Sequence, residues 1–228
     1  EKNEVTFRWI LFHLDQGFGP PIMYVNRING SKDVALSFFD KIIEEGKLEI
    51  VDFILPYAFY IHDQISQEMS CLERYRGRTV WIAFNNMDER FFSPDTNPND
   101  PRNNMTTAEV LRKYYTNVDN MNNLGALKCP NVWMKKDQYD NSTMDSMLAA
   151  YERTKCIIIP ENTDFFTIHF ITLGKNMKDV TDIVNGHFKV VTSEMDLSVI
   201  SFTKEIFSRK MTEINKRISA EMKRLFGI

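Results

Sequence analysis

Apolar segments that alternate between helical and strand periodicity fill the first 84 residues, and they constrain the fold more than any other feature. The elements predicted in this part are helices and strands in turn, over 5–16, 22–25, 34–45, 48–55, 61–75 and 79–84. Connections of this length suit β-α-β crossovers, which place strands parallel to one another. The strands are continuously apolar, as in a sheet that is buried on both faces. We therefore expect an α/β fold with a mostly parallel, Rossmann-like sheet and flanking helices.

The second half of the chain is less regular. Segment 93–106 is almost free of apolar residues and contains three prolines, which predicts a surface loop. The other predicted elements are a helix over 108–115, a loop over 117–123, a strand over 155–160, short strands over 167–171 and 188–192, and an amphipathic helix over 206–225. Residues 124–150 give no clear pattern. We divide the chain into one domain over 1–203 and a C-terminal amphipathic helix over 204–228.

Charge argues against a nucleic-acid-binding protein, because the chain carries a net charge of −3. The segment 204–228 is locally basic, with seven Lys or Arg residues against three Glu residues. We expect its helix to pack its apolar face on the protein and to expose the basic face; contact with an anionic membrane or a partner is the alternative. No apolar run is long enough to cross a bilayer, so we expect any membrane anchor to lie outside this sequence.

The cysteines allow either one disulfide with one free thiol or three buried thiols, and none of them has the close spacing of a zinc site. They are Cys71, Cys129 and Cys156. N-glycosylation sequons begin at Asn29, Asn104 and Asn141, which gives weak support for a secretory route.

Three of the predicted strands, over 22–25, before Pro56 and over 79–84, end with polar residues at their carboxyl ends, where α/β sheets bind ligands. Asn26 follows the strand over 22–25, and Asn86 and Asp88 follow the strand over 79–84. Alternate residues of an extended segment project to one side, so Asn86 and Asp88 can converge on one ion. Their oxygen atoms are ligands that hard divalent cations prefer. An ordinary acidic turn after a strand is the alternative.

Three stretches that occur in order carry a family resemblance. The first is a strand that ends at Pro56, and the second is Gln64 ahead of Cys71-Leu72-Glu73-Arg74-Tyr75-Arg76. The third is Trp81-Ile82-Ala83-Phe84, which leads into Asn86-Met87-Asp88-Glu89. This pattern resembles glycosyltransferase family 92. Thr154–Pro160, Ile168-His169 and His187-Phe188-Lys189 extend the resemblance, which covers about residues 5–192.

The resemblance implies a GT-A fold and transfer of a sugar, galactose, from a UDP-sugar to a glycan acceptor. It also implies Mn²⁺ or Mg²⁺ as cofactor, held by Asp88, Asn86 and His169, with Asn26, Asn86 and Asp88 binding the donor. The partners would be the nucleotide sugar and the glycan acceptor, with no nucleic acid. The implied location is the Golgi or another secretory lumen, as a type II membrane protein whose anchor lies outside this sequence.

Two positions depart from the family pattern. Asn86 stands where the family has Asp, so its carbonyl can coordinate a metal but supplies no negative charge. Lys189 stands in place of Arg and loses bidentate phosphate geometry. The family's strand ahead of the first helix is also not in this sequence. A catalytically inactive GT-A-like module that binds a glycan or nucleotide is therefore the alternative function. His169 has the alternative of a hydrogen-bonded core histidine, and no general base is assigned among Asp95, Asp100 and Glu161.

Overall fold

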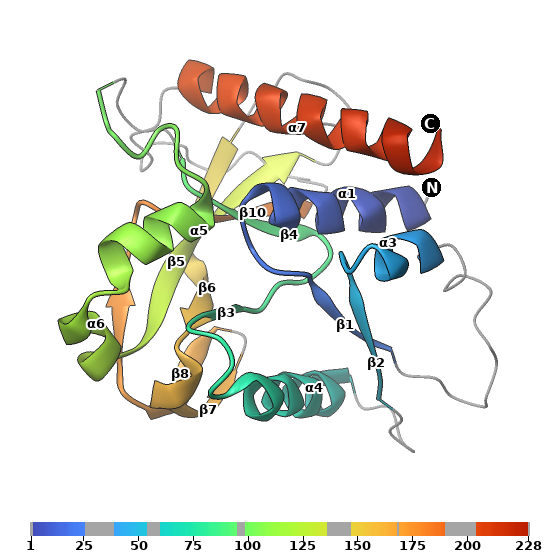
Figure 1. The fold of residues 1–228 in the computed structure, drawn as a ribbon. Coiled ribbons are helices and arrows are strands. Elements are labelled where there is room, and N and C mark those ends of the chain that lie inside the picture. Colours follow the sequence, from blue (N-terminus) through green and yellow to red (C-terminus); the bar gives the residue numbers. More distant parts are fainter. Residues whose placement is uncertain are drawn as a thin grey trace.

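The computed structural model describes residues 2–25, 39–53, 60–94, 99–135, 147–167, 169–189 and 204–227 (Figure 1). The helices are α1 (Lys2–Asp15), α3 (Asp40–Glu44), α4 (Tyr60–Tyr75), α5 (Thr107–Val110), the π-helical turn η2 (Leu111–Tyr115), α6 (Val118–Asn123), the 3-10 turn η4 (Pro160–Asn162) and α7 (Lys204–Phe226). The strands are β1 (Ile22–Val25), β2 (Glu49–Asp52), β3 (Ile82–Ala83), β4 (Glu89–Phe92), β5 (Leu124–Lys135), β6 (Met147–Ile158), β7 (Thr163–Thr167), β8 (Phe170–Gly174), β9 (Asn176–Asp179) and β10 (Val184–Lys189).

The described strands form one large mixed sheet and two strand pairs. The large sheet has the order β3-β6-β5-β10-β4, and β9 pairs with β5. Within it, β6 is antiparallel to both β3 and β5, and β10 is antiparallel to β4. The pairings of β5 with β10 and with β9 are parallel. Apart from this sheet, β1 and β2 form a parallel pair and β7 and β8 an antiparallel hairpin.

The α/β class is confirmed, but the mostly parallel Rossmann-like sheet is not what the structure shows. The parallel pair of β1 and β2 is the part that behaves as the β-α-β pattern predicts. The third strand, β3, is only two residues long and pairs antiparallel with β6. The reason is the long antiparallel pairing of β5 and β6, which arises from the segment without a clear periodicity and offers β3 an edge.

The large sheet is curled, and its connectivity explains why. β3 and β4 are the two edges of the strand order, yet only residues 84–88 join them. Four strand spacings of about 4.8 Å would separate these edges by about 19 Å in a flat sheet. A five-residue link that contains a tight turn is too short to cross that distance and still reverse direction. The sheet therefore bends its two edges toward each other.

Several local predictions hold and two are corrected. α1, β1, α4 and α7 match their predicted ranges to within three residues. The Asn-rich segment predicted as a loop over 117–123 instead contains α6, because the Asn117 side chain accepts a hydrogen bond from the Asn120 N–H at 2.8 Å and caps the helix. The strand predicted over 167–171 is the end of β7 and the start of β8, where the chain reverses.

α7 lies beside α1 at one side of the molecule, and α4 lies at the opposite side (Figure 1). The largest apolar cluster joins α1, α3 and α7 with residues of β4 and β10, and its buried members include Phe7, Ile10, Phe12, Ile42, Phe92, Val184, Ile214 and Ile218. The expected packing of the apolar face of the C-terminal helix is confirmed. The boundary proposed between residues 203 and 204 stays a prediction, since 201–203 lie outside the described residues.

Polar contacts fix α7 at several points along its length. Lys210 Nζ donates to the backbone oxygens of Ser93, Asn103 and Met105 at 2.7, 3.2 and 3.3 Å. Further along the helix, the Arg217 guanidinium donates to both carboxylate oxygens of Asp15 in α1. The basic residues of α7 thus help to attach the helix to the rest of the protein.

Among the described helices, none combines the length and apolar character that crossing a bilayer requires.

If α7 is part of the folded core, removing one of its buried side chains will destabilise the whole protein. Ile218 is 3% exposed, and Ile218→Ala is expected to lower the free energy of unfolding by about 2–4 kcal/mol through lost burial and a new cavity. Lys216→Ala, on the exposed face, is the matched control and should change it by less than about 0.5 kcal/mol. Urea unfolding measures both; equal small effects would show that α7 is only loosely attached.

Candidate functional site

The predicted ligand residues lie in a tight turn between β3 and β4. The Glu89 N–H donates to the Asn86 backbone oxygen at 3.0 Å, and the Glu89 carboxylate accepts from the Asn86 N–H at 2.9 Å. These reciprocal bonds close the 86–89 turn on itself. Asn86 and Asp88 are half-buried, and Met87 between them is 43% exposed at the tip. The turn therefore places Asn86 and Asp88 at partly exposed positions between β3 and β4.

Helix α1 holds the turn from one side. Trp9 Nε1 donates to the backbone oxygens of Asn86 and Glu89, at 3.0 and 2.9 Å. His13 lies one helical turn further on and is 3.0 Å from the Asn85 side-chain nitrogen through its Nε2. Its Nδ1 lies 2.8 Å from the Trp9 backbone oxygen, which can only accept, so Nδ1 carries the proton and Nε2 accepts from Asn85. His13 is thus neutral, and burial lowers its pKa to about 4.

A buried ion pair holds the turn from the other side. Lys155 Nζ in β6 lies 2.9 Å from a carboxylate oxygen of Glu89, and the two side chains are 2% and 1% exposed. Glu89 is the first residue of β4, so the pair links β4 to β6 across the curled sheet. A lone charge buried at this depth would be strongly unfavourable, which makes each partner dependent on the other.

A second buried carboxyl group interacts with the same lysine. Glu68 on α4 is 6% exposed, and burial raises its pKa to about 7, while the positive charge of Lys155 and a hydrogen bond with Gln64 act in the opposite direction. Its Oε2 is buried and has no hydrogen-bond partner within the described residues. Lys155 therefore interacts with two carboxyl groups: it forms a direct ion pair with Glu89 and a longer-range electrostatic interaction with Glu68.

His169 lies where the chain reverses between β7 and β8. Its Nδ1 is 2.7 Å from the backbone oxygen of Thr154, which can only accept, so Nδ1 donates this hydrogen bond. Thr154 immediately precedes Lys155 in β6. His169 contacts Thr154 and the 86–89 turn contacts Lys155, which are neighbours in β6. The same hydrogen bond of His169 is also what a histidine with a purely structural role in the core would make. Asn26, the remaining predicted donor ligand, lies outside the described residues.

The predicted ligand set of Asp88, Asn86 and His169 contains only one carboxylate. In the part of the chain that the structure describes, no three His, Cys, Asp or Glu side chains cluster as a metal site. Mg²⁺ and similar ions are commonly held by one or two carboxylates together with substrate phosphates. The Asp88 carboxylate and the Asn86 amide oxygen are donors of this kind, whereas an imidazole nitrogen such as that of His169 is preferred by transition metals. Metal ligation by these residues stays a prediction.

The three acidic residues left unassigned as general bases are placed as follows. Asp100 forms an ion pair with Arg102 at 2.6 Å, and Arg102 also pairs with Asp182 at 3.0 Å. Glu161 accepts a hydrogen bond from the Gly77 N–H. Asp95 lies outside the described residues, as does the side chain of Lys189. The contacts of Asp100 and Glu161 therefore link loop segments to one another, and neither residue contacts the 86–89 turn through them.

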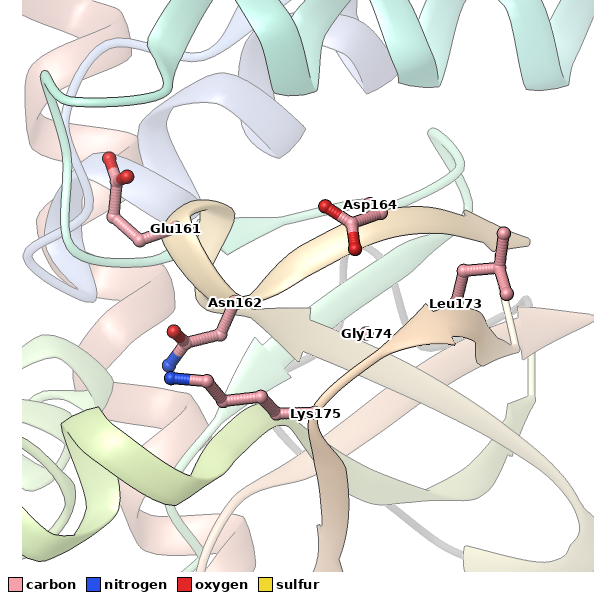
Figure 2. A pocket seen from close by; sticks show the side chains of 6 residues that line it. All are labelled: Glu161, Asn162, Asp164, Leu173, Gly174 and Lys175. Atoms are coloured by element: carbon pink, nitrogen blue, oxygen red, sulfur yellow. The ribbon is translucent and has the colours of Figure 1, made fainter.

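A pocket of about 290 Å³ lies between η4 and the β7–β8 hairpin (Figure 2). Its lining residues are Glu161, Asn162, Asp164, Leu173, Gly174 and Lys175. At one end of β3, Ile82 pairs with Ile158, which precedes the pocket residue Glu161 in the chain by three residues. Past the other end of β3, the 86–89 turn contacts Lys155, which lies earlier in β6. The pocket and the turn are thus at opposite ends of β3, and the pocket is separate from the predicted donor site.

The model of glycosyltransferase family 92 matches residues 6–224 of the chain. The chain belongs to glycosyltransferase family 92. The match confirms the resemblance and extends beyond it, because it includes α7 as far as Arg224. A comparison with curated proteins found no match.

Sequence reasoning did not identify the contacts that hold the 86–89 turn. They are made by Trp9 and His13 of α1 and by Lys155 of β6. The sequence did contain a signal for Trp9 and His13. They lie four residues apart on a helix predicted to be buried, so their ring N–H groups need hydrogen-bond partners. Lys155 likewise opens a strongly apolar segment, where a charge requires a buried counter-ion. Which groups they contact depends on long-range packing.

We expect the Glu89–Lys155 pair to show strong coupling in stability. Glu89→Gln leaves Lys155 buried without its counter-ion and should cost about 3–5 kcal/mol, whereas the double variant Glu89→Gln/Lys155→Met should recover much of that loss. Glu73→Gln, in an exposed pair with Arg76, is the control and should cost less than about 1 kcal/mol. Chemical unfolding of the parent, the two single variants Glu89→Gln and Lys155→Met, and the double variant gives the cycle, and additive effects would contradict the coupling.

His13 and Glu68 should contribute to the pH dependence of stability with opposite signs. Below pH 6.5 the unfolded chain protonates His13 but the native protein does not until about pH 4, so this term lowers stability as pH falls. Below about pH 7 the native protein protonates Glu68 but the unfolded chain does not until pH 4.5, so this term raises stability as pH falls.

The two contributions nearly cancel between pH 4.5 and 6.5, where both apply. Glu68→Gln should leave the His13 term, so that stability falls by roughly 3 kcal/mol on acidification across this window. His13→Gln should leave the Glu68 term and reverse the sign. Urea unfolding at a series of pH values measures the slopes; slopes of the same sign in both variants would contradict the assignment.

Proposed function

We propose that this family 92 protein is a metal-assisted glycosyltransferase that transfers galactose from a UDP-sugar to a glycan acceptor. The observation that carries the proposal is the 86–89 turn, in which the family motif is held at three points. These are the indole of Trp9, the imidazole of His13 through Asn85, and the ammonium of Lys155 through Glu89. A turn held this firmly is suited to a ligand that must be oriented to within about 0.5 Å.

In the proposed mechanism, Asp88, Asn86 and His169 would hold Mn²⁺ or Mg²⁺, and the ion supplies positive charge for the leaving diphosphate. The protein's own contribution is orientation. Because the backbone of Asn86 is hydrogen-bonded at both its N–H and its oxygen, the turn needs little rearrangement when the donor binds. Asn26, which follows β1 in the sequence and lies outside the described residues, would contact the nucleotide sugar. An acceptor hydroxyl would then lose its proton to a general base.

The proposed partners are a nucleotide sugar and a glycan, and the proposed location is the Golgi or another secretory lumen, with membrane attachment through a segment outside this sequence. The net charge of −3 supports a role without nucleic acid.

A non-catalytic module that binds a nucleotide or glycan is the second candidate. It is favoured by one observation, the neutral Asn86 at a position where the family pattern has a carboxylate. Loss of one negative ligand weakens the attraction for a divalent cation without disturbing the turn, whose hydrogen bonds involve the backbone of Asn86.

We expect UDP-galactose to bind in the presence of Mn²⁺, and Asp88→Asn to weaken donor binding by about tenfold or more through loss of the carboxylate. Asp164→Asn is the matched control, because Asp164 is an exposed carboxylate in the separate pocket and should leave the affinity unchanged. Isothermal titration of the full-length protein measures both affinities. Equal effects of the two substitutions, or no binding by the parent at millimolar donor, would rule out this donor site.

Asn86→Asp distinguishes the two candidate functions. If the protein is an active transferase, the parent releases UDP from UDP-galactose in the presence of an acceptor glycan, and the substitution mainly tightens Mn²⁺ binding. If only Asn86→Asp releases UDP, the protein is the binding module. Circular dichroism and thermal unfolding should be nearly the same for both proteins, because the hydrogen bonds of the turn are retained.

A further inference from the structure

One motif takes no part in the proposed transfer reaction: the sequon Asn104-Met105-Thr106 ahead of α5. The sequons at Asn29 and Asn141 lie outside the described residues, so Asn104 is the one for which the structure gives an environment. Asn-x-Ser/Thr accepts an N-linked glycan when it lies in a surface loop of a protein that enters the secretory pathway. The surroundings of Asn104 decide whether a glycan fits on the folded protein.

Asn104 is exposed in a turn whose backbone is fixed from the inner side. The Met105 N–H donates to the backbone oxygen of Arg102 at 2.9 Å. Lys210 of α7 donates to the backbone oxygens of Asn103 and Met105, the two neighbours of Asn104. In Figure 1 this loop stands out from the sheet beyond the first turns of α7. A glycan on the exposed side chain would therefore displace none of these contacts.

Thr106, the third sequon residue, is also the N-cap of α5. Its Oγ1 accepts from the Glu109 N–H at 3.3 Å and donates to the Glu109 carboxylate at 2.9 Å, and its own N–H donates to the same carboxylate. Asp and Ser cap helices about as well as Thr, so capping alone does not require a hydroxyl amino acid. N-glycosylation, by contrast, requires Ser or Thr at the third sequon position. A substitution that keeps the helix cap but removes the hydroxyl amino acid therefore separates the capping role of Thr106 from its role in the sequon.

We propose that Asn104 carries an N-linked glycan, an inference that rests on the secretory location proposed above. The co-reactant is an oligosaccharide on a polyprenyl diphosphate, supplied by the secretory pathway. The bond from the anomeric carbon to the diphosphate oxygen breaks, and a bond from that carbon to Asn104 Nδ2 forms. Nδ2 gives up one proton, and the lipid diphosphate leaves with the electron pair. The glycan then covers the loop 99–106 and the start of α5.

The experiment is site-resolved glycan mapping of the full-length protein expressed in insect cells. Enzymatic release of N-glycans in heavy-oxygen water converts each glycosylated Asn to a labelled Asp, and we expect the peptide that contains Asn104 to carry this label. Asn104→Gln should remove one glycan-sized step in electrophoretic mass. An unlabelled Asn104 peptide would overturn the proposal, whether or not Asn29 or Asn141 is modified.

Two variants of Thr106 control for folding. Thr106→Ser keeps both the sequon and the helix cap, so the glycan should remain. Thr106→Asp keeps the cap but destroys the sequon, so the glycan should be lost although the same variant from bacteria, which add no such glycan, melts as the parent does. Retention of the glycan in Thr106→Asp would overturn the proposal. Because the readout needs no donor sugar, a labelled Asn104 in a protein that fails to bind UDP-galactose would refute the transferase function alone.

Discussion

The short link between the two edge strands of the large sheet is the constraint on which the rest of this structure depends. Residues 84–88 must join β3 to β4 although three other strands lie between them in the sheet. The sheet curls to bring its edges together, and Glu89 at the start of β4 then reaches Lys155 of β6 inside the curl. The buried ion pair is thus both a consequence of the connectivity and a restraint on it, since a shift of β4 would leave two buried charges unpaired.

This constraint also accounts for the position of the candidate site. A link that spans a curled sheet has little freedom, and the 86–89 turn is further held by Trp9 and His13 from α1. α1 is in turn fixed by α7, through the shared apolar cluster and the ion pair between Asp15 and Arg217. The C-terminal helix therefore stabilises the site indirectly, which fits a family match that continues into α7.

Local patterns predicted the elements whose structure depends on neighbouring residues, such as β1, α4 and α7. They did not predict the sheet, because the partner of β3 is β6, which lies more than sixty residues later in the chain and is held by its pairing with β5. The same division holds at the site. Asn86 and Asp88 were predicted as ligands from their motif alone, whereas the interactions of Glu68 and Lys155 depend on how α4 and β6 pack in the folded protein.

The neutral residue at position 86 is compatible with this architecture for a physical reason. The contacts that shape the turn use the N–H and the backbone oxygen of Asn86, and they remain whichever side chain is present. Glu89 and Glu68 already place two carboxyl groups around the single charge of Lys155. A carboxylate at position 86 would add negative charge close to this group unless a cation were bound there. The neutral Asn86 adds no such repulsion, and the turn keeps its backbone hydrogen bonds with either side chain.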